Sequence, residues 1–387
     1  MSASQFSWYD FFAGGGLARL GIGDRWKCTF ANDISEKKAR AYRAQFGESP
    51  ELKVADVDLL TIKDLPGTPD LVWASFPCQD LSLAGAGAGL KGKRSGTFNP
   101  FWRLVKGLIK DDRKPKVVVL ENVVGAISSH RGTDFASLIR TICDAGYRVG
   151  PLVIDAVRFV PQSRPRLFMV ALDNSCDPPA GVLGDHPSPP WHPPSLIKSR
   201  GTLPTPYSDC WNWWRLPVPP DRDATLSSFI EARPTGVKWH AASETRRLIS
   251  LMSKLNKEKL ESVRQEGIPR IGTVYKRTRP VRVGEHLKKV QRAEVRFDEI
   301  SGCLRTPVGG SSRQIILFVH GQDTRSRLLS SVEAARLMGV PPTYPIPEKY
   351  SDAYHLFGDG LVVPAVAWLE KHLLRPLVLR KNFAQVA

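Results

Sequence analysis

Hydrophobic and polar residues follow two different patterns along this chain. Up to about residue 172, short apolar runs alternate with stretches in which apolar residues recur at helical spacing. The apolar runs are residues 8–12, 27–31, 71–76, 117–120 and 166–172. Buried strands separated by helices are typical of βαβ units around a parallel sheet. This part of the chain is therefore predicted to be an α/β domain.

The pattern changes near residue 175, where prolines and tryptophans replace the alternation of strands and helices. Proline pairs stand at 178–179, 189–190, 193–194 and 219–220, and tryptophans at 211, 213 and 214. Such clusters mark loops and domain boundaries. A segment rich in Lys and Arg follows at about 222–327, with helical spacing of apolar residues at 244–264. Apolar residues become frequent again in a predicted helix at 332–338 and in the run 361–374.

These changes predict three parts: residues 1–175, a smaller basic part at 176–327 inserted before the C-terminal helices, and residues 328–387, which fold back onto the first part. A length of 387 residues exceeds the size at which single cores stop growing. More than one domain, or a large domain with an insertion, is therefore expected.

The chain carries a strong positive charge. Lys and Arg number 55 against 38 Asp and Glu, which gives a formal net charge of +17 and a pI of about 9.7. This favours a polyanionic partner, nucleic acid first and an anionic membrane second. The longest uncharged apolar stretch, 361–369, is interrupted by Pro364 and falls short of the ~20 residues that a membrane span needs. No secretory signal is recognised either, so a cytoplasmic protein is expected.

The six cysteines are widely spread and include no Cys-x-x-Cys pair. Neither a zinc site nor a disulfide framework is therefore predicted, and no metal is expected.

Glycines follow the first predicted strand where a helix is expected to begin. Residues 11–17 read Phe-Phe-Ala-Gly-Gly-Gly-Leu, and glycines there permit a tight turn and close approach of backbone amides to a ligand. Asp33 follows the next apolar run, where a carboxylate can accept hydrogen bonds from ribose hydroxyls. Asp56 follows a third run and could accept from an adenine amino group. The pattern predicts a nucleoside cofactor, and a dinucleotide fits it about as well as S-adenosylmethionine.

A thiol and a carboxylate each stand at the end of a predicted buried strand. Cys78 follows the run 71–74, and Glu121 follows 117–120. The carboxyl ends of parallel strands border one crevice, so the two side chains could meet there. A lone cysteine is more often a small buried hydrophobe. The companion carboxylate favours a paired nucleophile and acid, which a hydride-transfer enzyme does not generally need.

At this point the chain resembles a known family, the DNA cytosine-5 methyltransferases. Six motifs occur in the family's order across nearly the whole chain. They are the loop 11–16, Pro77-Cys78-Gln79, Glu121-Asn122-Val123, Gln162-Ser163-Arg164-Pro165-Arg166, the helix 332–341 and Gly358-Asp359-Gly360. The resemblance implies a Rossmann-like methyltransferase domain with a mixed, mostly parallel sheet, and a target recognition domain in the basic insert.

The resemblance also implies a mechanism for the thiol and the acid. Cytosine C5 is a poor nucleophile, so the family's cysteine thiolate adds to C6 and makes an enamine that attacks a sulfonium methyl group. Cys78 would be that nucleophile, and Glu121 would contact N3 and the exocyclic amine. Arg166 would hold the base near Cys78, while Arg164 would help to organise the site, the two sharing one side of an extended strand. No residue is assigned to removal of the C5 proton.

S-adenosyl-L-methionine is the cofactor that the resemblance implies. Its expected contacts are Phe11, Ala13, Gly14, Gly16, Leu17, Asp33, Ile34, Asp56, Val57, Phe76, Asp359 and Leu361. Two residues depart from the family pattern, which often has Glu in place of Asp33 and usually Asn in place of Asp359. A carboxylate accepts but cannot donate as an amide can, so the contact at Asp359 is expected to be weakened.

Double-stranded DNA is the expected partner, and the target cytosine must leave the base stack to be reached. The glycine-rich, basic stretch 81–99 suits closure on DNA. The expected DNA contacts are Gln79, Ser82, Lys91, Arg94, Arg305 and Arg313. A monomer is expected, with a cognate restriction endonuclease as partner if the chain serves a restriction system. The target sequence cannot be read from these residues.

Two alternatives remain open at this stage. A basic surface and an unstacked cytosine also suit an RNA cytosine-5 methyltransferase, although the large insert favours DNA. A DNA-binding protein with a vestigial cofactor fold and no turnover is the other alternative, against which the presence of Cys78, Glu121 and Arg166 argues.

Overall fold

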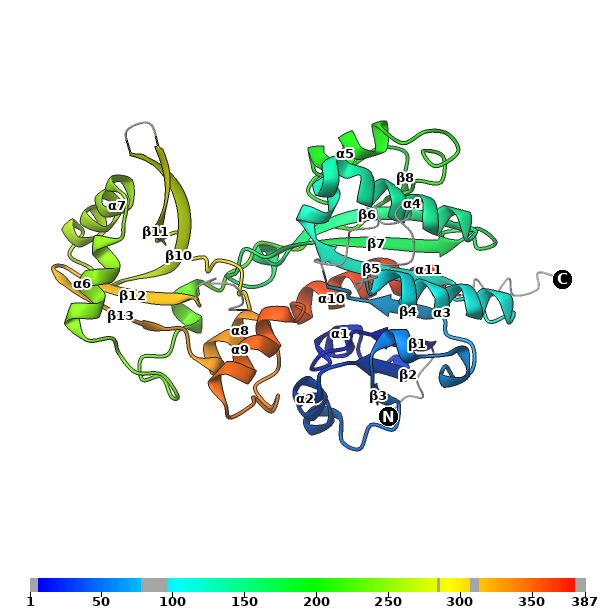
Figure 1. Ribbon diagram of the computed structural model, residues 1–387, viewed down its shortest axis with the longest axis horizontal. Helices are drawn as coiled ribbons and strands as arrows, with labels where there is room; N and C mark the ends of the chain where they lie inside the picture. The colour runs from blue at the N-terminus through cyan, green and yellow to red at the C-terminus, as the bar shows by residue number, and fades with distance from the viewer. Residues whose placement is uncertain (1–5, 78–95, 284–285, 307–312, 380–387) are drawn as a thin grey trace. The chain divides into compact units, whose positions relative to one another are not determined.

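The computed structural model describes residues 6–77, 96–283, 286–306 and 313–379. The chain forms two compact units (Figure 1). The first comprises Met1–Asp155, Pro165–Pro219 and Val363–Ala387, and the second comprises Ala156–Arg164 and Pro220–Val362. The Pro- and Trp-rich segment up to Pro219 thus belongs to the first unit.

The first unit is built on a seven-stranded sheet in the order β3-β2-β1-β4-β5-β7-β6. Strands β1 to β5 run parallel, whereas β7 is antiparallel to both of its neighbours. The predicted mixed, mostly parallel α/β sheet is therefore confirmed. The strands are β1 (Phe6–Phe11), β2 (Trp26–Asp33), β3 (Leu52–Val54), β4 (Leu71–Ala74), β5 (Val117–Val123), β6 (Tyr147–Asp155) and β7 (Pro165–Asp173).

Strand β6 was not expected from the sequence, because it contains Gly150 and Pro151. It lies at the end of the sheet, a position where a proline without N–H is tolerated. The outer edge of β6 is covered by the Pro- and Trp-rich segment: Val149 N donates to Cys210 O, and Val153 N donates to Trp191 O. At Gly150 a Cβ would lie 2.3 Å from Trp214 Nε1, so only glycine fits beside that indole.

Helices cover both faces of the sheet. Apolar side chains of α3 (Phe98–Lys110) and α4 (Thr133–Asp144) pack with Tyr9, Phe11 and Val72 in one core. Elsewhere α1 (Leu17–Ile22) packs on α10 (Val363–Leu369), where a Cβ on Gly21 would lie 2.5 Å from Val366 Cβ. The other elements of this unit are α2 (Glu36–Phe46), α5 (Pro194–Gly201), α11 (Arg375–Val378), the π-helix η8 (Glu370–Leu374) and the short strands β8 (Leu183–Gly184) and β9 (Trp213–Trp214).

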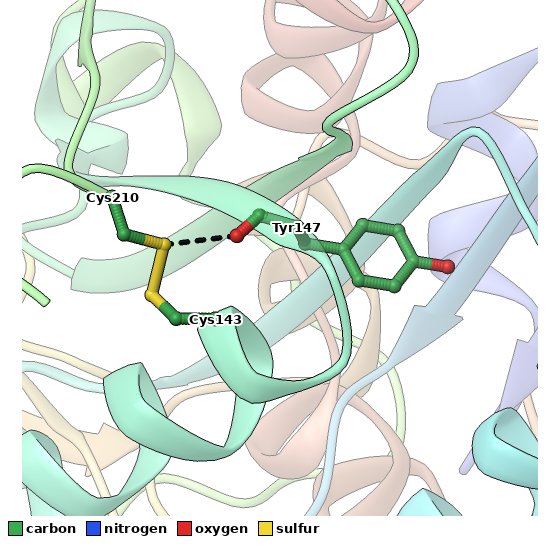
Figure 2. The surroundings of a disulfide bond; sticks show 3 residues. All are labelled: Cys143, Tyr147 and Cys210. Carbon is green, nitrogen blue, oxygen red and sulfur yellow. Dashed lines mark hydrogen bonds between the residues drawn. A yellow bond between two sulfur atoms is a disulfide. The ribbon is translucent and has the colours of Figure 1, made fainter. Parts of the chain in front are cut away.

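Cys143 and Cys210 form a disulfide that joins the end of α4 to the Pro- and Trp-rich segment (Figure 2). The sequence predicted no such bond, since the two cysteines are 67 residues apart and spacing alone does not reveal pairing. Figure 2 shows Sγ of Cys210 directed at the Tyr147 carbonyl oxygen, 2.9 Å away. This is a close contact only, because a disulfide sulfur has no hydrogen to donate.

Replacing Cys210 with serine is expected to lower the free energy of unfolding by about 4 kcal/mol without reductant, because the bond closes a long loop of the unfolded chain. Chemical denaturation with and without dithiothreitol measures this effect, which should vanish in reductant. Cys176→Ser, at a free and half-buried cysteine, is the matched control and should behave like the parent. Equal stability of Cys210→Ser and the parent without reductant would contradict the bond.

The second unit contains a four-stranded antiparallel sheet in the order β11-β10-β12-β13. Helices α6 (Ala242–Ser250) and α7 (Lys254–Gln265) contribute Leu248, Leu260 and Val263 to a core with Val274 and Leu317. The expected helix at 244–264 is thus two helices, the second capped by Ser253, whose side chain accepts from Asn256 N. The strands are β10 (Arg270–Val283), β11 (His286–Arg296), β12 (Ile315–His320) and β13 (Asp323–Leu328), and the remaining helices are α8 (Ser331–Leu337) and α9 (Tyr350–Asp359).

A buried ion pair holds β13 to the start of α8. Arg327 and Glu333 are both fully buried, and two nitrogens of the guanidinium donate to the carboxylate at 2.6 and 2.8 Å. Glu333 also accepts from the backbone amides of Ser330 and Glu231. Each carboxylate oxygen therefore has charged and neutral donors, as burial of a charge requires.

Among the described residues, no helix has the length and apolar character needed to cross a bilayer. The same part of the chain contains no group of three or more His, Cys, Asp or Glu side chains that could hold a metal ion.

Candidate active site

The glycine turn connects β1 to α1. The backbone has positive φ at Phe12 (61°), Gly14 (59°) and Gly16 (79°). A Cβ on Gly16 would lie 2.3 Å from a ring carbon of Phe46, so Gly16 is required by packing as well as by its conformation. A Cβ on Gly14 would meet only Lys38 Cδ, at 4.0 Å. Of these two glycines, Gly14 is the one beside open space.

Asp33, at the end of β2, holds this turn in place. Its two carboxylate oxygens accept from Gly14 N at 2.9 Å and from Ser35 N at 2.7 Å. An ionised carboxylate has about four acceptor sites, so these two bonds leave capacity for a ribose hydroxyl. Asp33 is therefore a positioning residue of the turn and also a candidate ligand residue.

Two neighbouring positions present side chains to solvent. Ile34 is 69% exposed, which is unusual for an isoleucine in a folded unit. Asp56 is exposed at the start of the 3₁₀ turn η1 (Val57–Leu59), and its carboxylate accepts from Asp58 N at 3.0 Å. Buried Asn32, which the sequence analysis missed, donates from Nδ2 to Lys53 O and Ala55 O. That amide fixes the segment that leads to Asp56.

Other expected cofactor contacts have side chains in the protein interior. Their exposed fractions are between 0 and 7%. Only backbone atoms of such residues can face a ligand without repacking of the core. They are Phe11, Ala13, Leu17, Val57 and Phe76.

The ends of β4 and β5 lie side by side. Ala74 pairs with Leu120 in the parallel ladder, and Asn122 Nδ2 donates to Phe76 O at 3.0 Å. The chain leading to position 78 is thus tied to the strand that carries Glu121. Cys78 itself lies outside the described residues, as do Gln79, Ser82, Lys91 and Arg94.

Glu121 and Arg166 form an ion pair on adjacent strands, with Arg166 Nε 3.3 Å from Glu121 Oε1. The side chains are 10% and 15% exposed, so both are largely shielded from solvent. Strand β7 is antiparallel to β5 and places Arg166 opposite Val123. The sequence could not indicate this pairing, because it depends on the reversed direction of β7.

Arg164 belongs to the second unit and is 2% exposed. The strand begins at Pro165, so the expected alternation of Arg164 and Arg166 along one strand is not observed. The Arg164 guanidinium donates to the carbonyls of Leu304, Gly358 and Gly360 at 2.7 to 2.8 Å. It therefore clamps the loop that carries Asp359.

Asp359 is exposed in the second unit and accepts from Thr306 Oγ1, which an asparagine carbonyl could also do. A Cβ on Gly358 would lie 3.0 Å from Thr306 N, so the close approach of these segments needs glycine. Leu361 is buried. Arg305 is exposed, and the guanidinium of half-buried Arg313 lies 5.2 Å from the ring centre of Tyr350.

Asp10 is a buried acid that the sequence analysis did not single out. It precedes the glycine turn on β1, is 1% exposed, and neither carboxyl oxygen has a hydrogen-bond partner among the described residues. Burial raises the pKa of Asp10 well above 3.8; nearby Arg19 lowers this pKa and Asp33 raises it. Burial therefore favours the uncharged form of Asp10.

The raised pKa of Asp10 predicts a pH-dependent stability. The stabilising contribution of this carboxyl is fully present below its unfolded-state pKa and is lost as pH rises toward the folded-state value. Asp10→Asn should remove this loss, so its unfolding free energy relative to the parent should rise by up to ~1.4 kcal/mol per pH unit from about pH 4 upward. Urea denaturation across pH measures the difference, and a pH-independent difference would show that folding does not raise the pKa of Asp10.

A family model for C-5 cytosine-specific DNA methylase matches residues 6–375, almost the whole chain. The chain belongs to this family. The methylase is 26% identical over 364 residues to the type II methyltransferase M.BsuFI of Bacillus subtilis, covering 94% of this chain and 71% of the relative. It is 24% identical to M.HhaI of Haemophilus parahaemolyticus, covering 93% of this chain and 91% of that one.

The fold of the methylase is shared with solved structures. The S. pombe Dnmt2 methyltransferase matches 96% of this chain and 99% of its own, with a TM-score of 0.58 and 16% identity. At this identity the match supports the fold only. The assignment of this methylase to its family therefore rests on the sequence comparisons.

Proposed function

We propose that this methylase transfers a methyl group from S-adenosyl-L-methionine to C5 of a flipped-out cytosine in double-stranded DNA, through a covalent Cys78 adduct at C6. The observation that carries the proposal is the tie between the ends of β4 and β5. Asn122 joins the backbone two residues before Cys78 to the strand of Glu121. Arg166, on β7, forms an ion pair with Glu121, and this pair lies on β5 and β7, of which β5 is next to the strand end that leads to Cys78.

The residues after β1, β2 and β3 fit the adenosine part of the cofactor. Asp33 retains acceptor capacity for ribose, exposed Ile34 offers an apolar surface for adenine, and exposed Asp56 offers an acceptor for an amino group. Backbone atoms at Phe11, Ala13, Gly16, Leu17, Val57 and Phe76 would complete these contacts, with Asp359 and Leu361 from the closing motif. When bound, the cofactor supplies an electrophilic methyl group on a sulfonium.

Cys78 would activate the base for methyl transfer. Its thiolate would add to C6 of cytosine, and the electron pair displaced to C5 would form the new bond to the methyl carbon. The sulfonium–methyl bond would break at the same time, with its electron pair returning to sulfur to leave a neutral thioether. The C5 proton is then removed, and the electrons of that C–H bond restore the C5–C6 double bond as the thiolate leaves. Free cysteine has a pKa of about 8.5, so thiolate formation needs a proton acceptor or a favourable local field.

Glu121 and Arg166 would act on the other side of the ring. A Glu121 carboxyl that shares a proton with N3 would stabilise the negative charge that builds up on the ring as C6 is attacked. Arg166 orients that carboxyl at 3.3 Å and would contact the base carbonyl. Arg164 would act indirectly, by holding the loop that carries Asp359.

We place target recognition in residues 176–327 and the closing segment in 328–387, with residues 1–175 as the catalytic part. Within the described residues, the basic sheet of the second unit would supply most contacts to the DNA, with Arg305 and Arg313 near its end. Gln79, Ser82, Lys91 and Arg94 would contact the DNA around the extruded base. We also propose that the enzyme acts as a monomer and that its partner is a cognate restriction endonuclease that acts on the same sequence.

Transfer of a labelled methyl group from S-adenosylmethionine to duplex DNA and, in parallel, to structured RNA tests this function. Nucleoside analysis of both products should show 5-methylcytosine in DNA alone. Label in RNA alone would make the chain an RNA methyltransferase. Binding of DNA without label in either polymer would favour a non-catalytic DNA-binding protein. Asp359→Asn would then be the first variant to test for restored activity.

A further inference from the structure

The strands β10 and β11 form a basic two-stranded ribbon in the second unit. Strand β12 pairs with β10 only at Arg270–Val274; from Tyr275 onward β10 pairs with β11 alone, and Figure 1 shows both strands continuing past β12. Most side chains of this extension are exposed or half-buried. Its described basic residues are Lys276, Arg277, Arg279, Arg282, His286, Lys288, Lys289 and Arg292.

The register separates these residues into two faces. Residues directly opposite each other in an antiparallel pair project from the same face, and alternate residues project from opposite faces. Arg277 pairs with Arg292, and Tyr275 pairs with Glu294. We call this side, with Arg277, Arg279, Arg292 and Glu294, the arginine face. The opposite face, with Lys276, Arg282 and Lys289, continues at its base into the buried side chains Val274, Ala293 and Val295.

The arginine face is arranged for a ligand rather than for stability. Like charges directly opposite each other in a sheet are unfavourable, and Arg277 and Arg292 occupy such a pair. A groove of about 320 Å³ lies at the base of this face and is lined in part by Lys259, Tyr275, Arg277 and Arg296. Binding to an electron-rich polymer would relieve the repulsion.

Glu294 orients one arginine of this face. Its oxygens contact Arg279 Nε at 2.5 Å and Nη2 at 2.9 Å, and Arg277 Nε lies 3.4 Å away. These bonds use the side edge of the Arg279 guanidinium. The end edge, with the outward N–H groups of Nη1 and Nη2, has no partner among the described residues, and the side chain is 46% exposed. A fixed pair of parallel donors is thus presented to solvent.

Two parallel donors match two neighbouring acceptors in one plane. In DNA these are O6 and N7 of guanine in the major groove, or two oxygens of a phosphate. The negative Glu294 beside Arg279 disfavours a phosphate, which carries charge of the same sign, but does not disfavour a neutral guanine edge. A two-stranded β-ribbon also fits the major groove, which is about 12 Å wide.

We propose that the arginine face of the ribbon enters the major groove of the target DNA and that Arg279, positioned by Glu294, reads a guanine of the recognition sequence. This inference rests on the proposed function, because it assumes that duplex DNA is the substrate. It assigns a specificity-determining residue and predicts that the recognition sequence contains a guanine outside the target base pair.

A randomised duplex library, methylated by the full-length enzyme and sequenced after bisulfite treatment, gives the recognition sequence. We expect an invariant guanine outside the target pair that becomes degenerate with Arg279→Gln. Replacing that guanine by 7-deazaguanine removes only the N7 acceptor. It should lower kcat/KM of the parent about 10- to 100-fold and leave Arg279→Gln unchanged. Arg279→Lys, which keeps the charge but not the fork, should resemble Arg279→Gln.

Glu294→Gln tests the positioning role through two readouts that move in opposite directions. Discrimination at the same guanine should fall, whereas affinity for non-specific DNA should rise, because a negative charge has been removed. A merely structural role would lower both. Arg282→Gln, on the opposite face, removes the same positive charge as Arg279→Gln and is the matched control for that variant. It should weaken binding to all sequences equally and leave the recognition sequence unchanged.

Three outcomes would overturn the inference while the proposed function stands: a recognition sequence without a second guanine, the same recognition sequence for Arg279→Gln and the parent, or a 7-deaza effect that persists in Arg279→Gln. Equal loss on every sequence would instead make Arg279 a phosphate contact. Absence of methylation on every duplex by the parent enzyme would refute the proposed function itself, and the reading role of Arg279 with it.

Discussion

Serine in place of Cys78 is expected to lower methyl transfer by at least about 10⁴-fold, an effect of the size seen when an enzyme nucleophile is removed. A serine hydroxyl is not ionised near neutral pH, so C6 of cytosine would have no anionic attacker. Binding of S-adenosylmethionine should be unchanged, because the thiol is needed to activate the cytosine ring and the proposed acceptors for adenosine, Asp33 and Asp56, follow β2 and β3. Label transfer measures the first effect, and calorimetric titration of the cofactor measures the second.

Cys176→Ser is the matched control for this prediction, because Cys176 is a free, half-buried cysteine outside the six motifs. It should retain parental activity. A duplex with 5-fluorocytosine adds a direct test, since a fluorine at C5 cannot leave as a proton does. The parent should form a stable protein–DNA adduct that the Cys78→Ser variant lacks. Loss of cofactor binding together with activity would instead identify Cys78 as a structural cysteine.

The largest effect on stability is expected at the buried ion pair of Arg327 and Glu333. Glu333→Gln removes the charge that compensates a fully buried guanidinium. Removal of one member of such a pair typically costs about 3–5 kcal/mol, because the other charge stays buried and unpaired. Hydrogen exchange of residues 323–337 under increasing urea measures this loss in the second unit itself.

Asp323→Asn provides the comparison on the same strand. Asp323 pairs with Arg325 at 3.5 Å, and both side chains are more than 60% exposed. An exposed pair contributes about 0–1 kcal/mol, so this variant should unfold almost like the parent. If Glu333→Gln were no more costly than Asp323→Asn, the buried Arg327 guanidinium would have to find water or another hydrogen-bond acceptor in the fold.

The sequence predicted most strands of the first unit, because strands buried on both faces appear as continuous apolar runs. It indicated β3, which has three residues, only as a short run before Asp56. It missed β6, in which Gly150 and Pro151 resemble a turn. The antiparallel sheet of the second unit was also missed. In the ribbon of β10 and β11, Lys and Arg occupy both faces, so the alternation of apolar and polar residues that indicates a strand is absent.

The motifs named candidate site residues, but the partners of these residues come from elsewhere in the chain and could not be predicted from the motifs. Asn122 stood within a recognised motif, yet its bond to Phe76 O depends on the adjacency of β4 and β5. Asp10 was overlooked because an acid within an apolar run has no sequence signal for its missing partners. The pairing of Glu121 with Arg166 requires the antiparallel course of β7, which local periodicity does not reveal.

The Pro- and Trp-rich segment protects the first unit from self-association. A sheet edge with free N–H and C=O groups can pair with another molecule and start aggregation. Here the bonds from Val149 and Val153 to Cys210 and Trp191 occupy that edge, and Pro151 interrupts its row of donors. A chain cut at residue 175 would lose this cover, so we expect it to aggregate through β6 although every predicted catalytic strand is present.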